Sequence, residues 1–209
     1  MNVLAIGGHY DDIELGAGGS IAKHVSEGDN VFAVVVTHSA YENYDGKLVR
    51  SKQTAWEEGV HAAKILGVDD LICLNYETKN VKYETKLIED LNKIMDEKKI
   101  DVVYTHWIHD VHQDHSAIGK ATLNAARHVP RILMYRSNWY ITSQQFVENF
   151  FVDITPHISK KIDSIKAHES ECDRRGEKWM KFVLQQNYNT GIKLGLEYAE
   201  GFEVVKWLI

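Results

Sequence analysis

The sequence predicts an α/β fold, a Rossmann-like and mostly parallel sheet flanked by helices. Short apolar runs alternate five times with segments of helical periodicity, a pattern typical of βαβ units and a parallel sheet. Acidic residues and histidines cluster after the first and the fourth of these runs, at the strand ends where ligands bind in such sheets. The 209 residues suit a single domain. We expect its core at residues 1–140 and a helical and strand C-terminal part at residues 141–209.

The expected strands are short apolar runs, and the expected helices are the periodic segments between them. The run NVFAVVVTH is continuous and β-branched, as strands buried on both faces are. Gly28 and Gly67 mark the ends of the first two helices. We expect strands at 2–7, 30–38, 70–76, 100–106, 131–137 and 201–209. We expect helices at 14–28, 51–68, 83–99, 116–129 and, mainly, 157–188, with a long functional loop at 39–50.

Composition and charge argue against several classes of protein. Acidic residues outnumber basic ones by 30 to 24 without a lysine–arginine block, so we expect no nucleic-acid partner. No run approaches the roughly 18 apolar residues of a membrane span, and the start MNVLAIGG does not resemble a signal peptide. Cys73 and Cys172 form no CxxC pattern and predict no disulfide framework, which favours a cytoplasmic protein. The oligomeric state stays open, a homo-oligomer included.

The first cluster is the stretch AIGGHYDDIELGAGG, residues 5–19. Its glycines do not follow the GxGxxG spacing of a dinucleotide loop, and two adjacent carboxylates would repel a pyrophosphate. His9 and Asp12, three positions apart in a tight turn, can converge on one metal ion, and Asp11 can act on water beside that ion. The alternative is that Asp11 or Asp12 caps the next helix and that Glu14 interacts with its dipole. Capping does not explain His9.

The second cluster is the stretch THWIHDVHQDHSAIG, residues 105–119, with histidines at every third position. On one helix each step of three residues lags by about 60°, so His106 and His115 would face opposite sides. We therefore expect the strand to end at His106 and a helix to begin with Asp114 as its N-cap and His115 in its first turn. His106 and His109 are interpreted as strand-end and loop residues.

The two clusters should face one crevice, because the first and fourth strands of a doubly wound sheet are commonly neighbours. His9, Asp12 and His115 then supply three ligands and leave a position open for water, as a catalytic divalent site requires. Asp11 remains as general base. His112 remains as a donor to developing oxyanion charge, with Asp114 able to fix its tautomer and raise its pKa.

These motifs resemble a known family. GGHYDDIELGAGG resembles the AHPDDxELGxGG signature of the LmbE/PIG-L-like N-acetylglucosaminyl deacetylases, and HQDHSAIG is similar to their HxDHxAxG segment. The ending GIKLGLEYAEGFEVV is similar to their GxxxGxxYAEAF segment. The resemblance implies a metal-dependent hydrolase, usually with zinc, that removes acetyl from the nitrogen of an amino sugar. It implies the same metal ligands (His9, Asp12, His115), base (Asp11) and oxyanion pair (His112, Asp114).

The resemblance also suggests substrate contacts. The family's substrate-binding arginine follows the second strand, where Arg50 is the best candidate, and Asn75 stands where the family has an acid after the third strand. Tyr10 replaces the family's usual proline and could offer a ring or hydroxyl to the substrate. Three residues after the fifth strand, Asn138, Trp139 and Tyr140, could line the sugar pocket, although Trp139 and Tyr140 could equally serve ordinary packing.

The expected mechanism is amide hydrolysis by metal-activated water with Asp11 as base and His112, as imidazolium, stabilising the oxyanion. Two His and one carboxylate suit Zn²⁺ and also Fe²⁺. One alternative is a non-catalytic sugar- or metal-binding protein, against which the retained base and oxyanion donor argue. Another is a metal-dependent ester or phosphoester hydrolase, against which the absence of a Lys/Arg pair beside the motifs argues.

Overall fold

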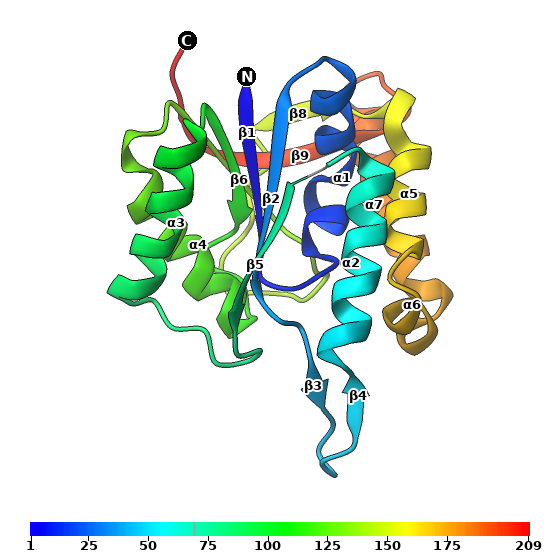
Figure 1. Cartoon of the computed structure of the whole chain (residues 1–209). Coiled ribbons are helices and arrows are strands. Elements are labelled where there is room, and N and C mark those ends of the chain that lie inside the picture. The colour runs from blue at the N-terminus through cyan, green and yellow to red at the C-terminus, as the bar shows by residue number, and fades with distance from the viewer. Residues whose placement is uncertain (69) are drawn as a thin grey trace.

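A computed structural model describes residues 1–68 and 70–209 and confirms the α/β fold (Figure 1). Its main sheet has seven strands in the order β5–β2–β1–β6–β7–β9–β8. The first five of these pair in parallel, and β9 and β8 add antiparallel strands at one edge. The strands of this sheet are β1 (Asn2–Gly7), β2 (Asn30–Thr37), β5 (Asp70–Tyr76), β6 (Val102–His106), β7 (Arg131–Tyr135), β8 (Phe150–Asp153) and β9 (Ala199–Trp207).

Helices cover both faces of the sheet (Figure 1). Leu4 and Ile6 of β1 pack in the cluster that contains the buried side chains of α3 and α4, whereas Val3 and Ala5 pack with α1 and α2. Within the described residues, no helix combines the length and the apolar character that a membrane crossing requires. The helices are α1 (Asp12–Ser26), α2 (Lys52–Leu66), α3 (Thr85–Lys98), α4 (Gln113–Ala125), α5 (Ile158–Lys166), α6 (Glu169–Arg175) and α7 (Glu177–Lys193), with short 3₁₀ turns η1 (Ala126–His128) and η2 (Thr155–His157).

The expected elements are confirmed to within a few residues, with three differences. The expected loop at 39–50 contains a hairpin of β3 (Tyr41–Glu42) and β4 (Leu48–Arg50). The expected helix at 157–188 is three helices, the last two separated by Gly176 with a φ of 66°. The edge strand β8 was not expected, because its four residues become a strand only by pairing with β9.

Two glycines let the helices of both motifs approach the sheet closely. A Cβ on Gly16 of α1 would lie 2.0 Å from the ring of Tyr135, and one on Gly119 of α4 would lie 2.5 Å from the backbone oxygen of His106. Because no larger residue fits without moving a helix, these glycines fix the distance between the sheet edge and the helix starts that carry the two motifs.

A fully buried ion pair joins α1 to the C-terminal part of the chain. Lys161 Nζ of α5 donates to Glu200 Oε1 of β9 at 2.5 Å and to the Leu15 carbonyl at 2.8 Å. The Glu200 carboxylate also accepts hydrogen bonds from the backbone N–H groups of Gly19 and Ser20. These contacts from α5 and β9 therefore fix the position of α1, the helix that begins at the first motif.

Replacing Glu200 by alanine should lower the free energy of unfolding by about 3–5 kcal/mol, because it leaves the Lys161 ammonium buried without its partner. Chemical denaturation followed by circular dichroism measures this loss. As a matched control, Glu177→Ala breaks the exposed pair with Lys181 and should cost less than about 1 kcal/mol. Equal small losses in the two variants would contradict the role of the buried pair.

Candidate active site

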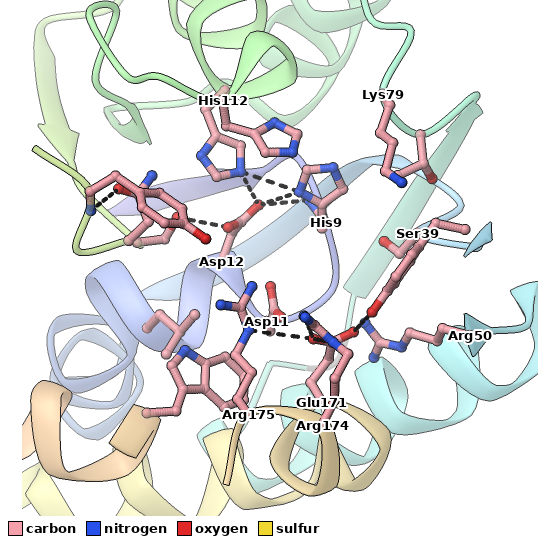
Figure 2. Close-up of a pocket in the computed structure, with 18 of the residues that line it drawn as sticks. His9, Asp11, Asp12, Ser39, Arg50, Lys79, His112, Glu171, Arg174 and Arg175 are labelled. Atoms are coloured by element: carbon pink, nitrogen blue, oxygen red, sulfur yellow. Dashed lines mark hydrogen bonds and ion pairs between the residues drawn. The ribbon is translucent and has the colours of Figure 1, made fainter. Parts of the chain in front are cut away.

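The two motifs meet at one edge of the sheet. β1 and β6 are parallel neighbours, with Val3 beside Val102, so their carboxyl ends lie side by side. The turn after β1 carries residues 9–12, and the loop and helix start after β6 carry residues 107–115. Side chains from both segments, among them His9, Asp11, Asp12, His112 and His115, line a pocket of about 500 Å³ (Figure 2). The expected juxtaposition of the first and fourth strands is therefore what the structure shows.

Three donor atoms of residues that line this pocket form a nearly equilateral triangle. His9 Nδ1, Asp12 Oδ2 and His115 Nε2 lie 3.2 Å from one another in each pair. Donors that bind a tetrahedral ion at about 2.0–2.1 Å lie about 3.3 Å apart. The spacing and the chemistry of these donors therefore fit one divalent metal ion, with a fourth position facing the pocket.

Carboxylates behind the two histidines orient their rings. Asp114 Oδ2 lies 3.0 Å from His9 Nε2, and Asp110 Oδ2 lies 3.3 Å from His115 Nδ1. A carboxylate on the far nitrogen fixes the tautomer of a metal-binding histidine and aims its other nitrogen at the ion. Asp110 was not among the expected site residues. Its position in the same histidine-rich loop was the available signal.

The structure corrects the expectation for Asp114. Helix α4 begins one residue earlier than expected, and its N-cap is His112, whose Nδ1 accepts the Asp114 backbone N–H at 3.3 Å. The Asp114 carboxylate points the other way and accepts the backbone N–H groups of Lys79 and Val81 at 2.7 and 3.1 Å. Asp114 therefore orients His9 and does not contact His112 through its carboxylate.

In the metal-free protein the pKa shifts favour protonated His9 and His115 beside an ionised Asp12. Burial opposes a positive charge on His9, but hydrogen bonds to Asp114 and Asp12 raise its pKa to about 9. Burial likewise opposes a charge on His115, but Asp12 and Asp110 raise its pKa to about 10. Burial would raise the pKa of Asp12, but the neighbouring histidines hold it well below its usual range. A divalent metal ion would displace the protons on His9 and His115 and supply positive charge in their place.

Asp11 has the properties of a general base. Its backbone φ of 132° lies where residues other than glycine are strained, and such strain is typical of functional positions. Among the described residues, no hydrogen bond occupies its buried carboxylate. Burial, together with repulsion from Asp12 and Glu171, raises the pKa of Asp11 to about 7. A carboxyl group with this pKa can both accept and return a proton near neutral pH.

The lowered pKa of His112 favours a neutral ring in the metal-free protein, whereas the sequence led us to expect an imidazolium. Burial and the nearby charges of His115 and His9 lower its pKa to about 4. Because its Nδ1 accepts a backbone N–H, the neutral ring carries its proton on Nε2. The ring stands edge-on to His9, with centroids 4.8 Å apart, and lines the pocket. It can donate one hydrogen bond there.

The other two histidines of the motif differ in position: His106 adjoins the donor triangle, with its Nε2 3.2 Å from Asp12 Oδ2, and His109 lies farther along the loop. His106 is buried at the end of β6, where its Nε2 accepts the Gly8 backbone N–H at 2.9 Å and its ring stacks on His115. His109 is exposed and contacts the edge of Trp107. Glu14 is buried 3.6 Å from His168 Nε2.

Four of the five expected substrate residues line the pocket: Arg50, Asn138, Trp139 and Tyr140. Arg50 is buried, and its guanidinium donates to the Tyr10 carbonyl at 3.0 Å and to Glu58 at 2.6 Å. Its Nε is buried without a partner among the described residues.

Tyr10 does not line this pocket, which corrects the expectation from the sequence. Its ring is 2% exposed and packs with Val35 and Ala55 beneath α2. Gly59 of α2 makes room for it, since a Cβ there would lie 2.3 Å from the ring. An aromatic ring gains more from this apolar niche than from a polar pocket, so Tyr10 anchors the turn that carries His9 and Asp11.

Several lining residues were missed in the sequence because they come from segments without a motif. The hairpin β3–β4 brings two tyrosines, the loop after β5 brings Lys79, and α6 and α7 bring a charged and aromatic wall. These residues are Tyr41, Tyr44, Thr78, Lys79, Ser137, Glu171, Arg174, Arg175 and Trp179.

The fold and the donor triangle define an α/β protein with a candidate three-ligand metal centre at the carboxyl edge of its sheet. The family described as GlcNAc-PI de-N-acetylase, PIG-L, matches residues 4–126, which include both motifs. The chain is 35% identical over 176 residues to the uncharacterized deacetylase YaiS of Escherichia coli, covering 80% of this chain and 90% of that protein. The chain therefore belongs to the PIG-L family.

Further relatives cover nearly the whole chain. The diacetylchitobiose deacetylase of Thermococcus kodakarensis is 25% identical over 97% of this chain and 82% of its own length. The solved structure of N,N'-diacetylchitobiose deacetylase from Pyrococcus horikoshii superposes with a TM-score of 0.85 and 25% identity, over 98% of this chain and 83% of that one. The similarity thus extends beyond the matched motifs to α5–α7 and β9.

Proposed function

We propose that this chain is a zinc- or iron-dependent deacetylase that hydrolyses the N-acetyl group of an amino sugar or sugar conjugate. The observation that carries the proposal is the 3.2 Å triangle of His9, Asp12 and His115 beside Asp11, whose carboxylate has no other described partner. The names of the relatives, which include diacetylchitobiose deacetylases, support an N-acetylated sugar as the substrate class.

His9, Asp12 and His115 would hold the ion. A divalent ion at such a site polarises an acetyl carbonyl and lowers the pKa of water. Two imidazole nitrogens and one carboxylate suit Zn²⁺ and Fe²⁺ alike.

The side chains around the triangle have distinct tasks. Asp11 takes a proton from the attacking water, and the same carboxyl returns a proton to the amine nitrogen as the C–N bond breaks. His112 Nε2–H donates to the carbonyl oxygen as that oxygen gains negative charge. Arg50, fixed by Glu58 and the Tyr10 carbonyl, lines the pocket where the sugar would lie.

The direct test is amine release from N-acetylglucosamine and its glycosides by metal-depleted protein reconstituted with Zn²⁺ or Fe²⁺. We expect free amine only after reconstitution, and no cleavage of a phosphoester offered in parallel. The proposal would be contradicted if no N-acetylated sugar released amine, or if the metal-depleted protein released amine as fast as the reconstituted protein.

Asp110→Asn should weaken zinc binding by about 10- to 100-fold, because an amide orients the His115 ring less firmly than a carboxylate. Competition against a chromophoric chelator measures this change. Asp96→Asn, on the exposed side of α3, removes the same charge and should leave the affinity unchanged. Equal affinities of the two variants would show that Asp110 does not act through His115.

Zinc binding at pH 7.5 should release about two protons per ion, since His9 and His115 are protonated below their raised pKa values of about 9 and 10. Because the ion competes with these protons, affinity should fall as pH falls. Calorimetry in two buffers of different ionisation enthalpy counts the protons. A count of zero would mean that both rings are already neutral.

A further inference from the structure

The wall of the pocket that faces the donor triangle is basic and aromatic. In Figure 2, Glu171, Arg174 and Arg175 lie on one side of Asp11, and His9 and His112 lie on the other. The first three residues come from α6, outside the residues 4–126 that match the family. This wall is therefore a feature of the C-terminal part of this chain and not of the two motifs.

Among the described residues that line this wall, Glu171 is the acid, and its carboxylate already has hydrogen-bond partners. Glu171 is buried and accepts hydrogen bonds from Tyr41 Oη at 2.8 Å and from Arg174, whose Nε lies at 3.1 Å. Arg175 Nε is 3.6 Å from the same carboxylate, beyond hydrogen-bond distance. Glu171 thus forms an ion pair with both guanidinium groups, but its single negative charge faces two positive charges, so the wall keeps an excess of positive charge.

Arg175 is held in place, yet no acceptor among the described residues lies within hydrogen-bond distance of its guanidinium. Its Cζ lies 5.4 Å from the Trp139 ring and 5.5 Å from the Trp179 ring, so cation–π contacts position the guanidinium. In the part of the chain that the structure describes, its Nε is buried and unpaired. A buried donor without an acceptor is costly, and a planar guanidinium presents a fork that matches carboxylate and phosphate oxygens.

We propose that the substrate carries a negatively charged group, a phosphate or a carboxylate, and that Arg175, supported by Arg174, binds it while the acetamide lies at the donor triangle. This inference rests on the proposed deacetylase function and narrows its substrate to anionic conjugates of an N-acetylated amino sugar. The alternative is that Arg175 only stabilises the Glu171 carboxylate by its charge. In that case Arg175 would not increase kcat/KM for an anionic substrate.

The test compares four substrates that differ in one substituent: the methyl, 2-aminoethyl and carboxymethyl glycosides of N-acetylglucosamine, and N-acetylglucosamine 1-phosphate. With reconstituted wild-type enzyme we expect kcat/KM for an anionic substrate to exceed that of the methyl glycoside by about 10- to 100-fold, the range for a hydrogen-bonded charged group. The aminoethyl glycoside should be the poorest. The carboxymethyl and phosphate arms show which anion fits.

Three variants locate the effect. Arg175→Gln should reduce the ratio of anionic to neutral kcat/KM by about 10-fold or more, and Arg175→Lys should restore part of it. Lys181→Gln removes one positive charge from an exposed side chain of α7 that does not line the pocket, and should leave the ratio at the wild-type value. A ratio near one in the wild-type enzyme, or a ratio that Arg175→Gln does not change, overturns the inference while the deacetylase function stands.

A binding measurement tests the inference about the anion site without requiring that the enzyme turn over a substrate. Calorimetry should show that glucosamine 1-phosphate binds about 10-fold or more tightly than methyl glucosaminide, and that Arg175→Gln removes the difference. If no N-acetylated sugar is hydrolysed, the proposed function fails. Anion binding that depends on Arg175 would then still support the anion site, and equal binding of the two ligands would overturn it.

Discussion

Replacing Asp11 by asparagine is expected to lower kcat by about 10²- to 10⁴-fold while the protein keeps its divalent ion. The amide has the shape of the carboxylate but cannot accept the proton of the attacking water. Asp11 is not part of the donor triangle, so the ion should stay. Steady-state amine release gives kcat, and elemental analysis gives the metal content. Full turnover by this variant would show that another group is the base.

The same substitution should raise the melting temperature of the metal-free protein at pH 8. The pKa of Asp11 is about 7 in the folded chain and near 3.8 when unperturbed, so the folded state holds this proton more tightly than the unfolded state does. Stability is therefore lost as pH rises from about 4 to about 7, and the loss stays complete above that. Asparagine does not ionise, so the variant does not lose this stability as pH rises. Melting temperatures of the two proteins should converge toward pH 4, and a constant difference would contradict the raised pKa.

His115→Ala should abolish binding of one ion per chain and lower amine release by several orders of magnitude, since it removes one of three ligands. The metal-free variant should also be less stable by about 3–5 kcal/mol, because Asp12 and Asp110 lose a buried cationic partner. Metal content, amine release and denaturant unfolding measure these effects.

The matched control for that variant is His109→Ala, which removes a histidine of the same loop that is exposed. It should change neither metal content nor stability by a measurable amount. If His115→Ala still bound one ion per chain with wild-type affinity, the donor triangle would not be the metal site.

Much of the fold was predictable because its strongest signals are local. Continuous apolar runs marked β1, β2 and β5–β7, and the alternation with helices predicted the parallel sheet. The same topology predicted that the turn after β1 would meet the loop after β6, and in the structure His9, Asp12 and His115 lie within 3.2 Å of one another. Their roles as metal ligands remain a proposal that the experiments above test.

The rest of the pocket could not be predicted, because it depends on side-chain direction and on distant segments. Tyr10 turns into the core because Gly59, far along the chain, leaves room for its ring. Asp114 turns to His9 because the chain after β5 supplies two backbone donors. The wall formed by Glu171 and Arg175 has no motif, and only the packing of α6 against the site reveals it.

Titration of zinc or ferrous ion into the metal-depleted protein, with amine release from an N-acetylated sugar followed in the same samples, tests the central claim most directly. We expect activity to rise in proportion to bound metal and to saturate at one ion per chain, and we expect no stoichiometric binding of the ion to His115→Ala. Amine release by the metal-depleted protein at the full rate, or one ion bound per chain without any amine release, would contradict it.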